Sequence, residues 1–136
     1  MNQQTFEKLK TKVKQDLTIT ESNIVMKCLE VPKLFMKYNE IFVKQLDHYK
    51  NLLLEKDRLY GDLYEHYKYN GKYSAGTKGE VEAFLYADER WIELNREVIK
   101  QECITKYVEN VLSDVKQLNF NLKNFIEYKK YLEGLV

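Results

Sequence analysis

The sequence contains little of what a β-sheet, a disulfide-stabilised domain or a membrane protein needs. Its 136 residues include one proline and five glycines, whereas sheets need many turns built from these residues. The two cysteines, Cys28 and Cys103, lack metal-binding spacing, so we expect reduced thiols and no metal. No apolar run approaches the roughly 20 residues of a membrane helix. These absences favour a soluble, single-domain, all-α protein spanning residues 1–136.

A strong net charge is also missing. Lysine and arginine number 22 against 21 aspartate and glutamate residues, a net charge of +1, so any nucleic-acid site must be a local patch. Arginine occurs only at Arg58, Arg90 and Arg96. Reading of base edges in duplexes depends largely on arginine, so sequence-specific duplex binding is not expected. A small helical enzyme of the chorismate-mutase type is disfavoured because it needs arginines that converge on an anionic substrate.

Catalytic and cofactor motifs are absent as well. The sequence has no glycine-rich phosphate loop, nucleophile elbow or His/Cys metal spacing. The acidic residues around Asp88 are better explained as a helix cap than as a metal or acid/base cluster, because helix N-termini favour carboxylates. We therefore expect neither an enzyme nor a bound cofactor.

Helical periodicity dominates what is present. Residues 1–31 predict two short helices, the second ending near Glu30 because Pro32 suits the first turn of a new helix. The first of them carries four lysines beside an apolar stripe. It is interpreted either as a solvated first helix or as a DNA-binding arm. The stripe and the lysines are Phe6, Leu9 and Val13 with Lys8, Lys10, Lys12 and Lys14.

Residues 32–69 predict one long helix with a coiled-coil spacing of apolar residues. At 1.5 Å per residue it would extend about 55 Å, whereas a compact domain of this length has a radius of gyration of only about 14 Å. Such a helix needs a partner, so we expect self-association. The seam consists of Leu46, Tyr49, Leu53, Lys56, Tyr60, Leu63 and Tyr67.

A glycine-rich loop is expected at residues 70–79, followed by C-terminal helices over residues 80–136. Thr77 and Glu80 have capping-box spacing. Asn119 or Asn121 would cap a final helix or mark a kink, and Gly134 would stop it. The simplest arrangement is a long antiparallel helical hairpin with shorter flanking helices.

Tyrosine is the outlier of the composition, with 11 residues. Tyr60, Tyr64 and Tyr67 share one helical face if the helix is regular. Tyrosine rings can stack on unpaired bases while cations contact phosphates, which indicates a single-stranded DNA site. The competing interpretation is the edge of a packed helix interface, with Asp57 and nearby carboxylates diluting the charge. The interleaved cations are Lys56, Arg58, Lys68 and Lys72.

Several segments together resemble the UvsY family of recombination mediators of T-even-like phages. The resemblance follows the Phe84–Asp88 segment, the Asn119–Gly134 segment, the Tyr67–Gly71 turn and the Lys14–Ile19 opening. The family's basic motif precedes its tyrosine-containing turn, and Lys56-Asp57-Arg58-Leu59 is the nearest equivalent here. Asp57 interrupts that motif and its spacing to the turn is longer, so Lys68 and Lys72 are expected to share the role.

The resemblance implies a recombination mediator that binds single-stranded DNA without strong sequence preference. It would help to load a RecA-like (UvsX-like) recombinase by displacing single-strand-binding protein, in the host-cell cytoplasm if the chain is of phage origin. It also implies a ring-like homo-oligomer that assembles through the C-terminal part. The alternative is an oligomeric helical scaffold with no nucleic-acid role. The expected oligomerisation residues are Phe120, Leu122, Phe125, Ile126 and Tyr131.

Overall fold

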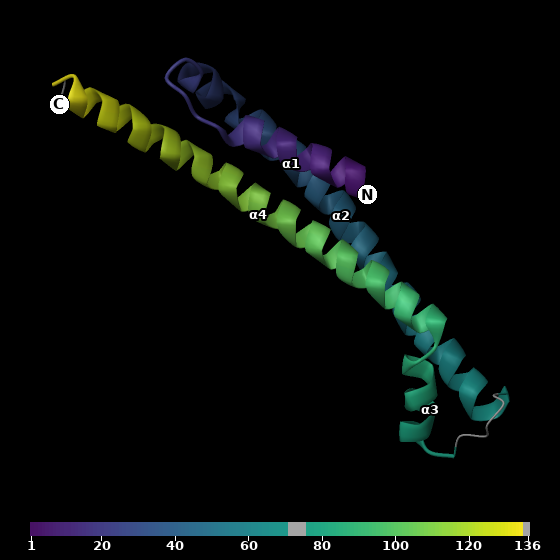
Figure 1. Cartoon of the computed structure of the whole chain (residues 1–136). Helices are drawn as coiled ribbons and strands as arrows, with labels where there is room; N and C mark the ends of the chain where they lie inside the picture. Colours follow the sequence, from purple (N-terminus) through teal and green to yellow (C-terminus); the bar gives the residue numbers. More distant parts are fainter. Residues whose placement is uncertain (71–75, 135–136) are drawn as a thin grey trace. The chain divides into compact units, whose positions relative to one another are not determined.

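The computed structural model describes residues 1–70 and 76–134, and within these ranges it contains helices and no strand (Figure 1). The prediction of an all-α protein is therefore confirmed for the described residues. Two of the helices are long. The elements are α1 (Gln3–Leu17), α2 (Ile24–Glu65), the π-helical turn η1 (His66–Asn70), α3 (Lys78–Tyr86) and α4 (Glu89–Leu132). Half of the expected loop at 70–79, residues 71–75, falls outside the described residues, and α3 begins at Lys78.

The chain divides into two compact units, which are described separately. Unit 1 consists of Met1–Val43 and Lys106–Val136. In it α1 packs with the first part of α2 and the last part of α4 around one apolar core. An edge-on contact between Phe6 and Tyr107, with ring centroids 5.3 Å apart, joins α1 to α4. The buried core residues are Val13, Val31, Leu34, Tyr38, Val111, Leu112, Val115, Leu118 and Leu122.

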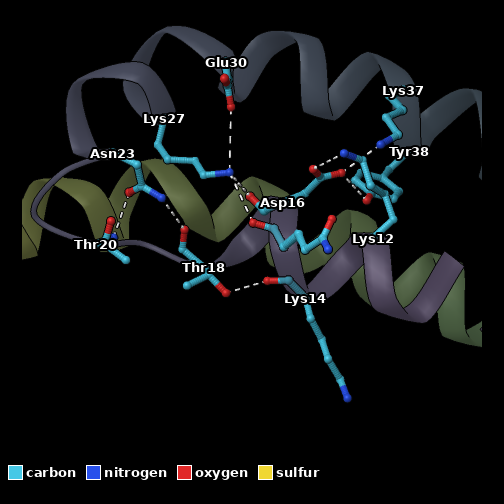
Figure 2. Close-up of polar contacts among 11 residues, drawn as sticks. Lys12, Lys14, Asp16, Thr18, Thr20, Asn23, Lys27, Glu30, Lys37 and Tyr38 are labelled. Atoms are coloured by element: carbon cyan, nitrogen blue, oxygen red, sulfur yellow. Dashed lines mark hydrogen bonds and ion pairs between the residues drawn. The ribbon is translucent and has the colours of Figure 1, made fainter. Parts of the chain in front are cut away.

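Polar contacts fix the turn between α1 and α2 (Figure 2). The Lys27 ammonium, which is buried, donates to the carbonyl oxygen of Asp16 at 2.7 Å. This places a cation at the C-terminal end of α1, where unpaired carbonyl groups favour it. Asn23 accepts from the Thr20 N–H at 2.7 Å and donates to the Thr18 carbonyl at 3.1 Å. These contacts give the connecting residues their backbone partners.

The expected break at Pro32 is wrong, because α2 continues through this residue. Proline inside a helix costs about 3 kcal/mol, since it lacks an N–H and its ring crowds the preceding turn. Val31 and Leu34 are buried in the unit 1 core, and their burial offsets this cost. Cys28, whose carbonyl would have received the missing N–H, is solvent-exposed, so water can replace the lost hydrogen bond.

Unit 2, Lys44–Thr105, contains the second part of α2, then η1, α3 and the start of α4. Within it α2 and α4 run antiparallel, since Gln101 contacts Gln45 while Trp91 contacts Tyr60. Gln101 is buried and donates to Gln45 Oε1 at 2.9 Å and to the Gln45 carbonyl at 3.2 Å. Leucine, valine and isoleucine side chains form the interior of unit 2. The buried apolar residues are Leu52, Leu63, Val81, Leu85, Val98 and Ile104.

The C-terminal helix differs from the expectation at one point. α4 runs unbroken from Glu89 to Leu132, so neither Asn119 nor Asn121 caps a new helix. Gly134 has φ of +69°, a conformation that favours glycine, and its N–H donates to the Tyr131 carbonyl at 3.1 Å. Gly134 therefore ends the helix as the sequence predicts. No helix in the described part of the chain is long and apolar enough to cross a membrane.

Candidate nucleic-acid interface

The described members of the expected tyrosine and basic set lie in α2 and η1, within unit 2, which also contains α3 and the start of α4. The local sequence determines how α3 begins there. The Thr77 hydroxyl accepts from the Glu80 N–H at 3.2 Å, and the Glu80 carboxylate accepts from the Gly76 N–H at 3.0 Å. This is the predicted capping arrangement, with the glutamate reaching one residue before the cap. It fixes the start of α3 beside the tyrosines.

Asp88 connects the start of α4 to η1. One carboxylate oxygen accepts from the Arg90 backbone N–H at 2.8 Å, as expected of a helix cap. The other accepts from the Tyr67 hydroxyl at 2.6 Å and from the Arg90 guanidinium at 2.9 Å. The guanidinium hydrogen bond, followed by that from Tyr67, lowers the pKa of Asp88 below its ordinary value. Asp88 is therefore charged at neutral pH and holds Tyr67 by its hydroxyl.

Tyr60 of α2 is also held through its hydroxyl by a carboxylate of another helix. Its hydroxyl donates to Glu82 of α3 at 2.8 Å. That hydrogen bond, with a smaller effect of burial, raises the pKa of Tyr60 to about 12. Its ring lies 5.9 Å from the Tyr64 ring and 6.0 Å from the Trp91 ring, centroid to centroid. Tyr60 thus links α2 to both α3 and α4.

The structure separates Tyr67 from the other two expected tyrosines. Tyr60 and Tyr64 lie together on α2, but Tyr67 belongs to η1, where the wider π-helical turn changes the direction of its side chain. The Tyr67 ring stacks on Phe84 of α3 with centroids 5.9 Å apart and planes 17° apart. The His66 ring contacts the Tyr67 ring edge-on, with centroids 4.9 Å apart. The three rings therefore do not form one continuous stripe.

The expected cations are distributed around these rings. Lys56 Nζ lies 5.6 Å from the Trp91 ring centroid. Lys68 Nζ lies 5.9 Å from the Tyr64 centroid and 5.4 Å from the Tyr69 centroid. Such distances are typical of cation–π contacts. Arg58 is exposed and forms no ion pair with any residue in 1–70 or 76–134. Lys72 lies outside the described residues.

Two exposed rings of unit 2 were not among the expected site residues. The Tyr69 side chain is 71% exposed and Tyr86 is 49% exposed. The Tyr86 ring lies 5.7 Å from the Trp91 ring, centroid to centroid, and Trp91 was not among the expected site residues either. The sequence did contain a signal for Trp91. It follows the Asp88 cap by three positions, so in an antiparallel pair it falls near the end of α2.

The expected oligomerisation residues lie on α4 in unit 1, and they divide into two groups. Phe120, Ile126 and Tyr131 are exposed, and Phe125 is half-buried. Leu122 is only 2% exposed and belongs to the unit 1 core. Its side chain therefore packs within the unit 1 core, and its part in oligomerisation stays a prediction.

Fold and site together define an all-α protein with a cluster of aromatic rings on unit 2, three of which lie beside lysine side chains. Among the described residues there is no group of three or more side chains that could hold a metal ion. The UvsY family, described as "Recombination, repair and ssDNA binding protein UvsY", matches residues 12–135. The chain belongs to this family. A comparison with curated proteins gave no match.

Solved structures show the same fold. Three crystal structures of the bacteriophage T4 recombination mediator protein UvsY superpose on the chain. Lattice type II has a TM-score of 0.82 at 14% identity and covers 98% of each chain. Lattice type IV has a TM-score of 0.79 at 15% sequence identity and covers 93% of this chain and 97% of the other. Lattice type I has a TM-score of 0.79 at 14% sequence identity and covers 91% of this chain and 98% of the other.

Proposed function

We propose that the chain binds single-stranded DNA with little sequence preference and acts as a recombination mediator. The observation that carries this proposal is the pairing of cations with aromatic rings at the end of α2. Lys68 lies close to the rings of Tyr64 and Tyr69, and Lys56 lies close to Trp91. Rings and cations in this mixture suit unpaired bases and phosphates respectively. Membership of the UvsY family supports the same role.

The proposed site assigns different tasks to the tyrosines. The exposed rings of Tyr69 and Tyr86, with half-buried Tyr64, would stack on bases. Tyr60 and Tyr67, held by Glu82 and Asp88, would keep the surface in place. The cations proposed to contact phosphates are Lys56, Arg58, Lys68 and Lys72.

Mediation requires that the chain bind competing DNA complexes with different strengths, because a ligand shifts an equilibrium only by its differential affinity. In the proposal, the chain binds DNA occupied by a RecA-like recombinase more favourably than DNA occupied by single-strand-binding protein. ATP hydrolysis would remain with the recombinase.

The proposal includes assembly of the chain into a ring-like homo-oligomer. Apolar side chains at the end of α4 support it, since Phe120 is 61% exposed and Tyr131 is 72% exposed. Phe125 and Ile126 lie on the same stretch of helix. A ring would repeat the DNA site, and repeated sites raise the effective concentration for one strand.

The experiment is a titration of fluorescent oligo-dT and of a duplex of equal length over a range of salt concentrations. We expect preference for oligo-dT, and log K falling with log salt by about 0.7 per neutralised phosphate. Replacing Lys56, Arg58, Lys68 and Lys72 together by alanine should strongly weaken binding while the oligomer persists. Equal affinity for duplex, or binding insensitive to salt, would count against the proposal.

A scaffold without a nucleic-acid role is the second candidate, and one observation favours it. The hydroxyls of Tyr60 and Tyr67 are both bound to carboxylates of the same unit, as expected of a packed helix interface. In that case the wild-type protein would assemble but leave oligo-dT unbound. Light scattering with and without the oligonucleotide separates the two candidates.

A further inference from the structure

The charges of the chain are divided unevenly between the two units. Unit 2, which contains the candidate interface, holds ten lysines and arginines against twelve carboxylates, a net charge of −2. Unit 1 holds twelve lysines against nine carboxylates, a net charge of +3. A polyanion is therefore attracted to unit 1 more than to the unit with the tyrosines.

Two lysines of unit 1 meet at one buried carboxylate (Figure 2). Asp16 of α1, only 8% exposed, accepts from the buried Tyr38 hydroxyl at 2.6 Å and from Lys37 Nζ at 2.8 Å. Lys12 Nζ lies 3.5 Å from its other oxygen. One carboxylate thus brings together two ammonium groups from two helices. The side chains of Lys12 and Lys37 nevertheless remain 56% and 38% exposed.

Two further lysines extend this pair along the same helix faces. Lys8 precedes Lys12 by one turn on α1, and Lys33 precedes Lys37 by one turn on α2. Residues four apart are neighbours on a helix surface, about 5–6 Å between Cβ atoms. Both lysines are exposed, and neither forms an ion pair with any residue that the structure describes. We call Lys8, Lys12, Lys33 and Lys37 the lysine row.

Carboxylates limit the row without neutralising it. Asp16 is buried, and Tyr38 occupies one of its oxygens from the core side. Glu30 lies 3.7 Å from Lys27, which is buried at the end of α1. Exposed Glu40 follows Lys37 by three positions and marks the end of the basic stretch on α2. The lysine row therefore offers positive charge to only a few phosphates of a strand.

We propose that the lysine row is a second binding surface for the phosphates of single-stranded DNA, separate from the aromatic site. The inference rests on the proposed function and adds a contact on α1 and α2. Each ammonium has three donors, so Lys12 and Lys37 keep donors for phosphate oxygens while Asp16 holds them in place. Lysine binds phosphate as a point charge and does not read bases. The row therefore increases affinity without sequence preference.

The test compares two double variants of the full chain. Lys8→Gln/Lys33→Gln removes the two lysines of the row that lack ion pairs, so the Asp16 contacts remain. The control, Lys14→Gln/Lys123→Gln, removes the same charge from the same unit. Lys14 lies on α1 about 200° around the helix from Lys12, and Lys123 lies on α4. Both control lysines are exposed.

The readout is the salt dependence of oligo-dT binding by fluorescence anisotropy. We expect the slope of log K against log salt to shrink by about 1.4 in the row variant, from two lost phosphate contacts. The control should keep the wild-type slope, and Lys8→Arg/Lys33→Arg should keep it too. Circular dichroism and light scattering verify that fold and assembly are unchanged. If the wild type binds oligo-dT and the row variant has the same slope as its control, DNA binding by the lysine row is overturned while the proposed function stands. The same result is expected if the row binds an acidic protein. No binding by the wild type overturns the proposed function and the row together.

Discussion

Replacing Tyr38 by phenylalanine tests the contact that holds α1 on α2. The Tyr38 side chain is fully buried, and its hydroxyl donates to the Asp16 carboxylate at 2.6 Å. Phenylalanine retains the ring and its packing, so only the hydrogen bond is lost. A hydrogen bond to a charged group contributes about 1.5–3 kcal/mol. We therefore expect the free energy of unfolding to fall by about 2 kcal/mol.

The assay is urea unfolding followed by circular dichroism, at one protein concentration because the proposed assembly would also affect stability. With a urea dependence of about 2 kcal/mol per molar, the midpoint should fall by about 1 M. Tyr107→Phe is the matched control in the same unit. Burial raises the pKa of Tyr107, and its ring contacts Phe6, but its hydroxyl has no hydrogen bond to any described residue. Its midpoint should barely move. Equal midpoints for the two variants would refute the role given to the Asp16 contact.

Three further outcomes follow from the site and the core. Tyr69→Ala should weaken oligo-dT binding by about 5- to 150-fold, since stacking contributes about 1–3 kcal/mol per base, whereas Tyr67→Phe, measured by the same titration, should leave affinity nearly unchanged. Asp88 has a lowered pKa, so its contribution to stability is present above about pH 4 and is lost as the pH falls further. Asp88→Asn should therefore lower the urea midpoint at pH 7, and the difference from the wild-type midpoint should shrink as the pH falls below about 4. Leu122→Ala should lower the free energy of unfolding by about 2–5 kcal/mol, and unfolding that is unchanged would contradict its place in the core.

Helix content was predictable from the sequence because the apolar residues repeat at helical spacing and turn residues are scarce. The breaks within that content were not. Pro32, Asn119 and Asn121 are local signals for helix ends, yet α2 and α4 continue through all three. Burial of Val31 and Leu34 outweighs the local cost at Pro32. Local propensity is a weak guide where tertiary packing contributes more.

The candidate site was predictable in composition but not in arrangement. The spacing of Tyr60 and Tyr64 places them together, and their rings do lie 5.9 Å apart. The carboxylates that bind the tyrosine hydroxyls come from Glu82 and Asp88, more than twenty positions away. The π-helical turn that moves Tyr67 out of line has no sequence signature in the periodicity. Both features depend on tertiary contacts, which spacing along one helix cannot reveal.

The proposals of assembly and DNA binding depend on each other through the size of the available contacts. Two well-exposed rings, Tyr69 and Tyr86, would contribute about 2–6 kcal/mol of stacking. Association alone costs about 4–15 kcal/mol in lost translational and rotational freedom, and unit 2 carries a net charge of −2. One copy should therefore bind DNA weakly even with help from the lysine row. Useful affinity requires several copies on one strand, where each later contact is effectively intramolecular. A variant that stays monomeric should bind long oligo-dT little better than short oligo-dT, whereas the assembled protein should gain steeply with length.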